Sequence, residues 1–129
     1  ELKKKAPAPA ISAASLAATA RQLKGVSVTV ACVPGVDRKV LSTLADETKG
    51  ISQGIAVLFT TEDEKSTLVT SIQTGLTDRW NSNNIVKRLA VLIGGKGGGR
   101  PDFAQAGGNS VADPDRLIGE IWHELEQII

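Results

Sequence analysis

The chain of 129 residues contains one cysteine, one histidine and no methionine. The single Cys32 excludes an internal disulfide and fits a reducing compartment. His123 has no second cysteine or histidine at a metal-ligand spacing, which argues against a zinc site. The sequence also has no run of about 18 apolar residues, so no membrane-spanning helix is predicted.

A secretory signal is lacking as well. The lysines near the start are followed by alanines that Pro7 and Pro9 interrupt, whereas a signal peptide needs an unbroken apolar core. We therefore expect a cytoplasmic location. Because the chain begins at Glu1 and has no methionine, we also expect it to be a piece of a longer protein.

Aromatic residues and excess charge are both scarce. Two phenylalanines, two tryptophans and no tyrosine leave the core to aliphatic side chains. A net charge of +1 is far from the strongly basic balance that alone would indicate nucleic-acid binding, so such binding would need a local cluster of cations. The hydrophobic content of 41% is typical of a soluble globular domain.

The composition divides the chain into three parts. Residues 1–10, rich in lysine, alanine and proline, are expected to be a flexible linker. Residues 11–24 contain good helix formers and end before Gly25, so they are predicted to be the end of a helical linker. Residues 25–129 are predicted to form the globular domain.

Apolar periodicity predicts the elements of this domain. Strands are expected at 26–33, 54–60 and 66–73, the last two as a hairpin. Helices are expected at 37–49, at 81–93 and from Pro114 to the end, with Asp113 as the cap of the last. The predicted fold is therefore an α/β domain with a small mixed β-sheet flanked by helices, preceded by the linker helix.

The segment from Gly94 to Gly108 carries seven glycines and is expected to be a loop. Glycine survives where the backbone must approach something closely, and bare amides can face an anion. Lys96 and Arg100 place cations beside these amides. A structural turn with two solvated cations is the alternative. A phosphate-binding P-loop is excluded, because Arg100 and Pro101 stand where its lysine and serine or threonine would be.

The run Gly94-Gly95-Lys96-Gly97-Gly98-Gly99-Arg100-Pro101-Asp102-Phe103-Ala104-Gln105-Ala106-Gly107-Gly108 resembles the DHH-associated domain found at the C-terminus of alanyl-tRNA synthetases. Gly75-Leu76-Thr77-Asp78-Arg79 and the helix between the two motifs are similar to that family too. The resemblance covers approximately residues 12–129.

The resemblance implies a non-catalytic module that binds the elbow of tRNA(Ala) and assists aminoacylation and editing by the parent enzyme. It implies the aminoacylation and editing domains as further partners, and allows a homodimer. No cofactor is expected in this fragment; ATP and magnesium, and in some members zinc, would belong to other domains. Carried over by motif, the contact surface contains Gly97, Gly98, Gly99, Arg100, Gln105 and Lys96.

A second cationic group could extend this surface. Arg79, Lys87 and Arg88 lie on or before the helix that leads into the glycines, and a plain solvated face is the alternative. Trp80 is interpreted as packing beneath that helix rather than stacking on RNA. Asp102 either pairs with Arg100 or fixes the turn.

Two other functions remain open. The chain could be the substrate-binding half of a DHH-type phosphodiesterase, a family in which a histidine occupies the position of Arg100. It could also be a self-association module that uses Ile121, Leu125, Ile128 and Ile129 of the last helix. Cys32 is interpreted as a small buried hydrophobe and His123 as a helix-surface residue.

Overall fold

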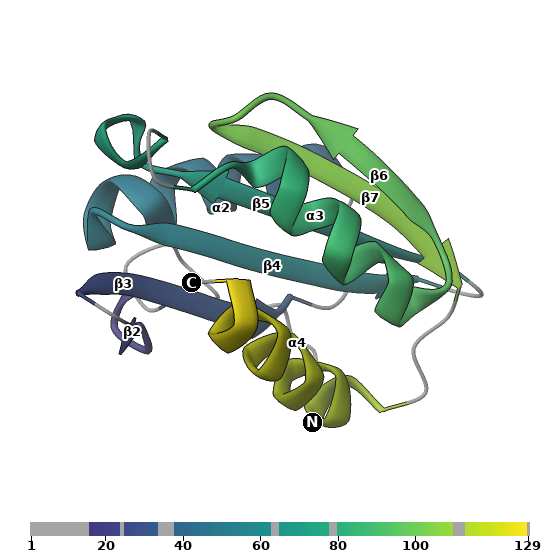
Figure 1. The fold of residues 1–129 in the computed structure, drawn as a ribbon. Helices are drawn as coiled ribbons and strands as arrows, with labels where there is room; N and C mark the ends of the chain where they lie inside the picture. The colour runs from purple at the N-terminus through teal and green to yellow at the C-terminus, as the bar shows by residue number, and fades with distance from the viewer. Residues whose placement is uncertain are drawn as a thin grey trace, which may run out of the picture.

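The computed structural model describes residues 16–23, 25–33, 38–62, 65–77, 80–109 and 113–128. These residues form a mixed sheet with helices on both faces (Figure 1), which confirms the predicted α/β class. The elements are β2 (Arg21–Leu23), β3 (Val26–Cys32), α2 (Arg38–Ser52), β4 (Ile55–Glu62), β5 (Lys65–Ile72), η1 (Thr74–Leu76), α3 (Ser82–Ala90), η2 (Val91–Ile93), β6 (Lys96–Gly99), β7 (Phe103–Asn109) and α4 (Pro114–Ile128).

The six strands lie in the order β2-β3-β4-β5-β7-β6. Strands β3 and β4 are parallel and are joined by α2, whereas every other neighbouring pair is antiparallel. The predicted hairpin is confirmed as β4 and β5, which pair from Ile55–Ile72 to Glu62–Lys65. The hairpin of β6 and β7 completes the sheet, with β6 at its edge.

Helix α2 covers one face of the sheet, and α3 and α4 cover the other (Figure 1). The central strand β4 is therefore buried on both sides. Its residues Ile55, Val57 and Phe59 belong to the core beneath α3 and α4, while Ala56 and Leu58 belong to the core beneath α2. A strand covered on both faces needs apolar side chains at consecutive positions, which explains the unbroken apolar run in the sequence.

Helix α4 begins as the sequence predicts. The side chain of Asp113 accepts a hydrogen bond of 3.1 Å from the Arg116 amide, which is the geometry of an N-cap, and Pro114 takes the first helical position. The buried residues of α4 repeat every four positions and are Leu117, Ile121 and Leu125.

The prediction of a helix up to Lys24 is wrong for residues 21–23. These residues form β2, which pairs antiparallel with β3 after a reversal at Gly25, whose φ of +88° lies in the left-handed region. Arg21, Gln22 and Leu23 are good helix formers, but pairing with an open sheet edge outweighs that modest preference. Residues 11–15 of the predicted helix lie outside the described residues.

Two single-residue interpretations are also settled. Trp80 is 9% exposed and packs in the core with α3, as predicted. Cys32 is half-buried beside that core, and burial, followed by the nearby Asp115 carboxylate, raises the pKa of its thiol. None of the helices in the described part of the chain has the length and hydropathy that crossing a membrane requires.

Candidate nucleic-acid interface

The glycine-rich segment is a β-hairpin rather than the loop we predicted. Residues 96–99 pair with residues 104–107, and Gly97 lies opposite Ala106 while Gly99 lies opposite Ala104. A methyl group on Gly97 would lie 2.4 Å from Ala106 Cβ, and one on Gly99 would lie 2.6 Å from Ala104 Cα. These two glycines are therefore required by close packing of the strands.

The ends of the hairpin depend on glycine for the same reason. A methyl group on Gly95 would lie 1.9 Å from the Gly107 carbonyl oxygen, and one on Gly108 would lie 2.5 Å from that of Ile93. Gly94 ends η2 with a φ of 67°, in the left-handed region. Much of the glycine content thus serves the fold, which corrects the expectation of an open cradle made by the whole segment.

The outer edge of β6 is nevertheless lined by main-chain groups. The Arg100 amide donates to the Phe103 carbonyl at 2.8 Å, so Arg100 and Phe103 are a hydrogen-bonded pair. Along an antiparallel ladder, hydrogen-bonded pairs alternate with pairs whose amides point away from the partner strand. By this alternation, the amides of Gly97 and Gly99 point away from β7, toward the edge. The Gly99 amide donates to Asn83 Oδ1 at 3.0 Å.

Helix α3 brings polar side chains to this edge. Its N-cap is Asn81, whose side chain accepts hydrogen bonds from the amides of Asn83 and Asn84. A methyl group on Gly98 would meet Asn83 Oδ1 at 3.1 Å and Lys87 Cε at 4.0 Å. The structure therefore places Lys87 beside Gly98, as the extended surface requires. Sequence reasoning missed Asn83, although its position in the first turn of a helix with an asparagine cap was a signal.

The turn between β6 and β7 presents Arg100. Two hydrogen bonds hold this turn: the Ser82 amide donates to the Pro101 carbonyl at 2.8 Å, and the Ile72 amide donates to that of Asp102 at 2.9 Å. The Arg100 side chain is 75% exposed and its Nε lies 3.5 Å from a carboxylate oxygen of Asp102. The turn is thus fixed while the guanidinium remains accessible.

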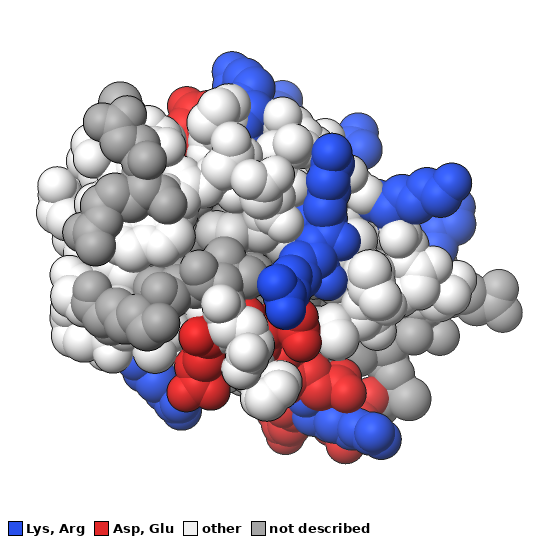
Figure 2. Space-filling view, viewed as in Figure 1, with Lys and Arg blue, Asp and Glu red and all other residues white. Residues whose placement is uncertain are grey.

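Arg88 takes a different direction from Lys87. Its Nε donates to Glu124 of α4 at 2.8 Å, and the two side chains are 51% and 24% exposed. Figure 2 shows cationic atoms crossing this face as a ridge over α3, with acidic atoms gathered at its lower end, over α4. Arg88 therefore lies at the boundary between the two charges. Arg79 lies outside the described residues.

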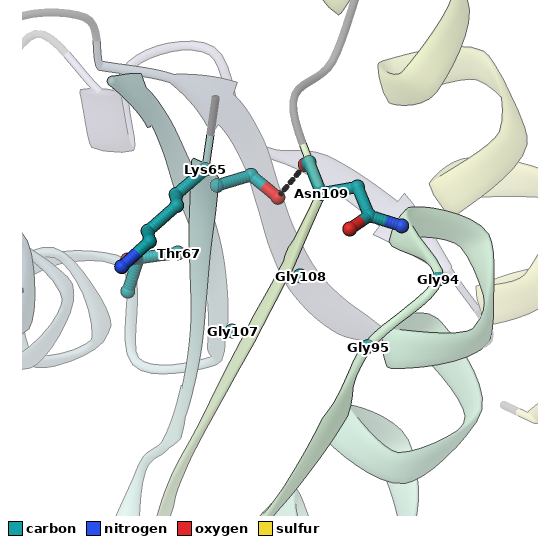
Figure 3. A pocket seen from close by; sticks show the side chains of 8 residues that line it. Lys65, Thr67, Gly94, Gly95, Gly107, Gly108 and Asn109 are labelled. Carbon is teal, nitrogen blue, oxygen red and sulfur yellow. Dashed lines mark hydrogen bonds between the residues drawn. The ribbon is translucent and has the colours of Figure 1, made fainter. Parts of the chain in front are cut away.

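Lys96 and Gln105 lie at the other side of the hairpin. With Thr67, Ala106 and Gly107, and with Arg38 at the start of α2, they line a pocket of about 180 Å³, the Lys96 pocket. A neighbouring pocket of about 480 Å³, the Lys65 pocket (Figure 3), shares Thr67 and Gly107 with it. It is lined by Lys65, Ser66, Thr67, Gly94, Gly95, Gly107, Gly108 and Asn109.

The residues predicted from the motif and from the second cationic group therefore divide between two places. Arg100, Lys87 and the amides of β6 lie along the sheet edge, whereas Lys96 and Gln105 lie in the pocket. Arg38, Lys65 and Thr67 were not predicted, because nothing in their local sequence connects them with the hairpin. In the described part of the chain, no cluster of three histidine, cysteine or carboxylate side chains is arranged to hold a metal ion. His123 is exposed on α4.

Comparison with known families accounts for this arrangement. Residues 25–129 match the model of the DHHA1 domain. The chain belongs to the DHHA1 domain family. An alanine–tRNA ligase of Shewanella loihica (strain ATCC BAA-1088 / PV-4) is 40% identical over 113 residues, which is 87% of this chain and 13% of that protein. The chain thus spans about an eighth of this curated relative.

Solved structures share the fold of this DHHA1 domain. The C-Ala domain of Aquifex aeolicus alanyl-tRNA synthetase matches with a TM-score of 0.76 and 21% identity, over 85% of this chain and 96% of that one. A DHH-domain protein described as a member of the s1p family of ribosomal proteins matches with a TM-score of 0.57 and 15% identity, over 90% of this chain and 30% of that one. The resemblance to the alanyl-tRNA synthetase C-terminal domain, inferred from the glycine-rich motif, is confirmed.

Proposed function

We propose that this DHHA1 domain is the tRNA-binding C-terminal module of an alanyl-tRNA synthetase. It contacts the elbow of tRNA(Ala) and thereby assists aminoacylation and editing by the other domains of the parent enzyme. The similarity to an alanine–tRNA ligase over 87% of the chain supports the assignment of the domain to such a parent enzyme. The proposal assigns no catalytic residue to this module.

One observation carries the choice of the hairpin as the contact surface. Arg100 is 75% exposed on a turn that backbone hydrogen bonds fix from two sides. A guanidinium presented in this way can approach a phosphate with both of its outer nitrogens, at little cost in ordering the backbone. Lys87 adds a second cation along the same edge, where it lies beside Gly98.

The charge distribution supports the same face. Helix α4 carries Asp115, Glu120, Glu124 and Glu126 against a single arginine, so it would repel a phosphate backbone. The cationic ridge in Figure 2 lies over α3, on the side of the hairpin. A net charge of only +1 is therefore compatible with a cationic surface over α3 and the hairpin, where Asp102 pairs with Arg100.

Substituting Arg100 tests the proposal. Arg100→Ala is expected to weaken tRNA(Ala) binding about tenfold, since a charge-assisted contact to phosphate is lost, and to leave the unfolding midpoint unchanged because the side chain is exposed. Arg116→Ala is the matched control: Arg116 is 77% exposed and also pairs with a carboxylate, but lies on acidic α4. Filter binding measures the affinity. Equal affinities of the two variants would remove Arg100 from the interface.

A dinucleotide competitor separates this proposal from the phosphodiesterase alternative. The substrate-binding half of a phosphodiesterase would bind the dinucleotide about as well as it binds intact tRNA. The proposed module instead requires folded tRNA, because double-helical RNA is recognised largely through shape and backbone.

A further inference from the structure

Gly107 is the one glycine of β7 that the fold does not explain. It lies in the middle of three strands, opposite Thr67 of β5 and Lys96 of β6, and it is exposed. A methyl group on Gly107 would approach only the Ser66 carbonyl oxygen, at 3.9 Å, an ordinary contact distance. Its φ also lies outside the left-handed region. Glycine inside a strand costs about 0.5–1 kcal/mol relative to alanine, and close packing does not require it at this position.

The surroundings of Gly107 are cationic and polar. Since the side chains of paired residues project from the same face, Thr67 and Lys96 flank the bare backbone on either side. Arg38 and Gln105 add to the Lys96 pocket, and Lys65 lines the neighbouring Lys65 pocket, which also includes Gly107.

The described lining of both pockets contains three cations and no carboxylate. Figure 3 shows the side chains of Lys65 and Thr67 on the same side of β5, while the Asn109 amide is turned toward Gly94. The ion pairs among the described residues do not involve Arg38, Lys65 or Lys96. Within the described part of the chain, none of these three cations is therefore neutralised by a carboxylate.

We propose that Arg38, Lys65 and Lys96, with Thr67 and Gln105, form a phosphodiester-binding subsite around the bare backbone at Gly107. The subsite rests on the proposed function and adds a second RNA contact to that of Arg100. The cations neutralise the phosphate, the hydroxyl and the amide donate hydrogen bonds, and the absence of a Cβ lets the sugar-phosphate chain approach the sheet.

The distance between the two contacts favours RNA over a mononucleotide. Lys96 and Arg100 are four residues apart at the two ends of β6, which corresponds to about 14 Å along an extended strand. A mononucleotide offers its phosphate to only one of two cationic positions that far apart unless both side chains bend toward each other. The backbone of a folded RNA carries a series of phosphates and can supply one to each position.

Gly107→Ala is the sharpest test of the subsite. Alanine should leave the unfolding midpoint unchanged or raise it, because the methyl group has room and the strand gains a better residue. The same methyl group should lower the affinity for tRNA(Ala) about tenfold by obstructing the backbone approach. Gly119→Ala is the matched control, because Gly119 lies on acidic α4 and a methyl group on it would meet nothing within 4 Å. This variant should bind tRNA(Ala) as tightly as the wild type does.

Lys96→Gln and Arg38→Gln, measured by filter binding across a salt series, test the charges. Each is expected to reduce the slope of log affinity against log salt by about 0.7–0.9, because one phosphate contact is lost.

If Gly107→Ala and both charge variants bind like the wild type while Arg100→Ala is weakened, the subsite is wrong and the proposed function stands. If the wild type does not bind tRNA, both fail. If the variants lose affinity for AMP but not for tRNA, the pocket serves a free nucleotide and the proposal is overturned.

Discussion

The glycines of the hairpin differ in whether close packing requires them, and alanine substitutions can measure this through the free energy of unfolding. Gly97→Ala should lower the free energy of unfolding by about 1–3 kcal/mol, because the new methyl group would lie 2.4 Å from Ala106 Cβ and force the strands apart. Urea unfolding measures the change. Gly119→Ala, in an exposed turn of α4, should instead stabilise by about 1 kcal/mol through helix propensity. A harmless Gly97→Ala would show that the hairpin packs less closely than described.

The Cys32 thiol should react slowly. Its raised pKa, caused first by burial and then by Asp115, leaves less thiolate at a given pH than an ordinary cysteine has. The folded state therefore holds its thiol proton to higher pH than the unfolded state does. This contribution to stability is complete below the unfolded pKa and is lost as the pH rises through the folded pKa.

Alkylation by iodoacetamide at pH 8 measures this effect. The folded chain should react more slowly than the urea-unfolded chain, and Asp115→Asn should increase the folded rate because the second cause is removed. Equal rates for the folded and unfolded chains would contradict the assignment.

At the scale of elements, the open edge of β6 depends on α3. Asn83→Ala removes the acceptor of the Gly99 amide, so amide exchange at Gly99 should become faster. The loss of stability should be about 1 kcal/mol, the net value of one hydrogen bond. Asn84→Ala, one position along the same helix and exposed, is the control. Unchanged exchange at Gly99 would show that α3 does not hold this edge.

Elements with strong patterning could be predicted from sequence, whereas β6 could not. Strands β3 to β5 are predicted by their apolar runs rich in β-branched residues. Helix α4 is predicted by the capping residue and proline at its N-terminus. Lys96–Gly99 contains no residue with strand preference. It forms a strand because the backbone of Gly97 and Gly99 can pack closely against Ala106 and Ala104 of β7, where a larger residue would clash.

The candidate site divides in the same way. The glycine-rich motif pointed to Arg100, and the polar side of the helix before it pointed to Lys87, which lies beside Gly98. Lys65 and Arg38 join Lys96 only because β5 and β7 are neighbours in the sheet and α2 begins beside them. That order depends on long-range pairing, which a single sequence does not reveal.

For the whole molecule, segregation of charge matters more than its sum. Lys87, Lys96 and Arg100 lie on α3 and the hairpin, whereas four carboxylates lie on α4, so under the proposed function the polyanion would approach from the hairpin side. The same acidic helix carries Ile121, Leu125 and Ile128, which are among the apolar residues named for self-association, whereas Ile129 lies outside the described residues. Among them, Ile121 and Leu125 are fully buried within the chain and cannot also form an exposed interface.

The most direct measurement compares intact tRNA(Ala) with a shortened tRNA(Ala) that keeps the acceptor stem and lacks the elbow, in a filter-binding salt series. The proposed function predicts tighter binding of intact tRNA, by at least about tenfold, with an affinity that falls steeply as salt is added. Equal affinity for both RNAs would contradict it, because the cationic edge of the hairpin would then not contact the tRNA elbow.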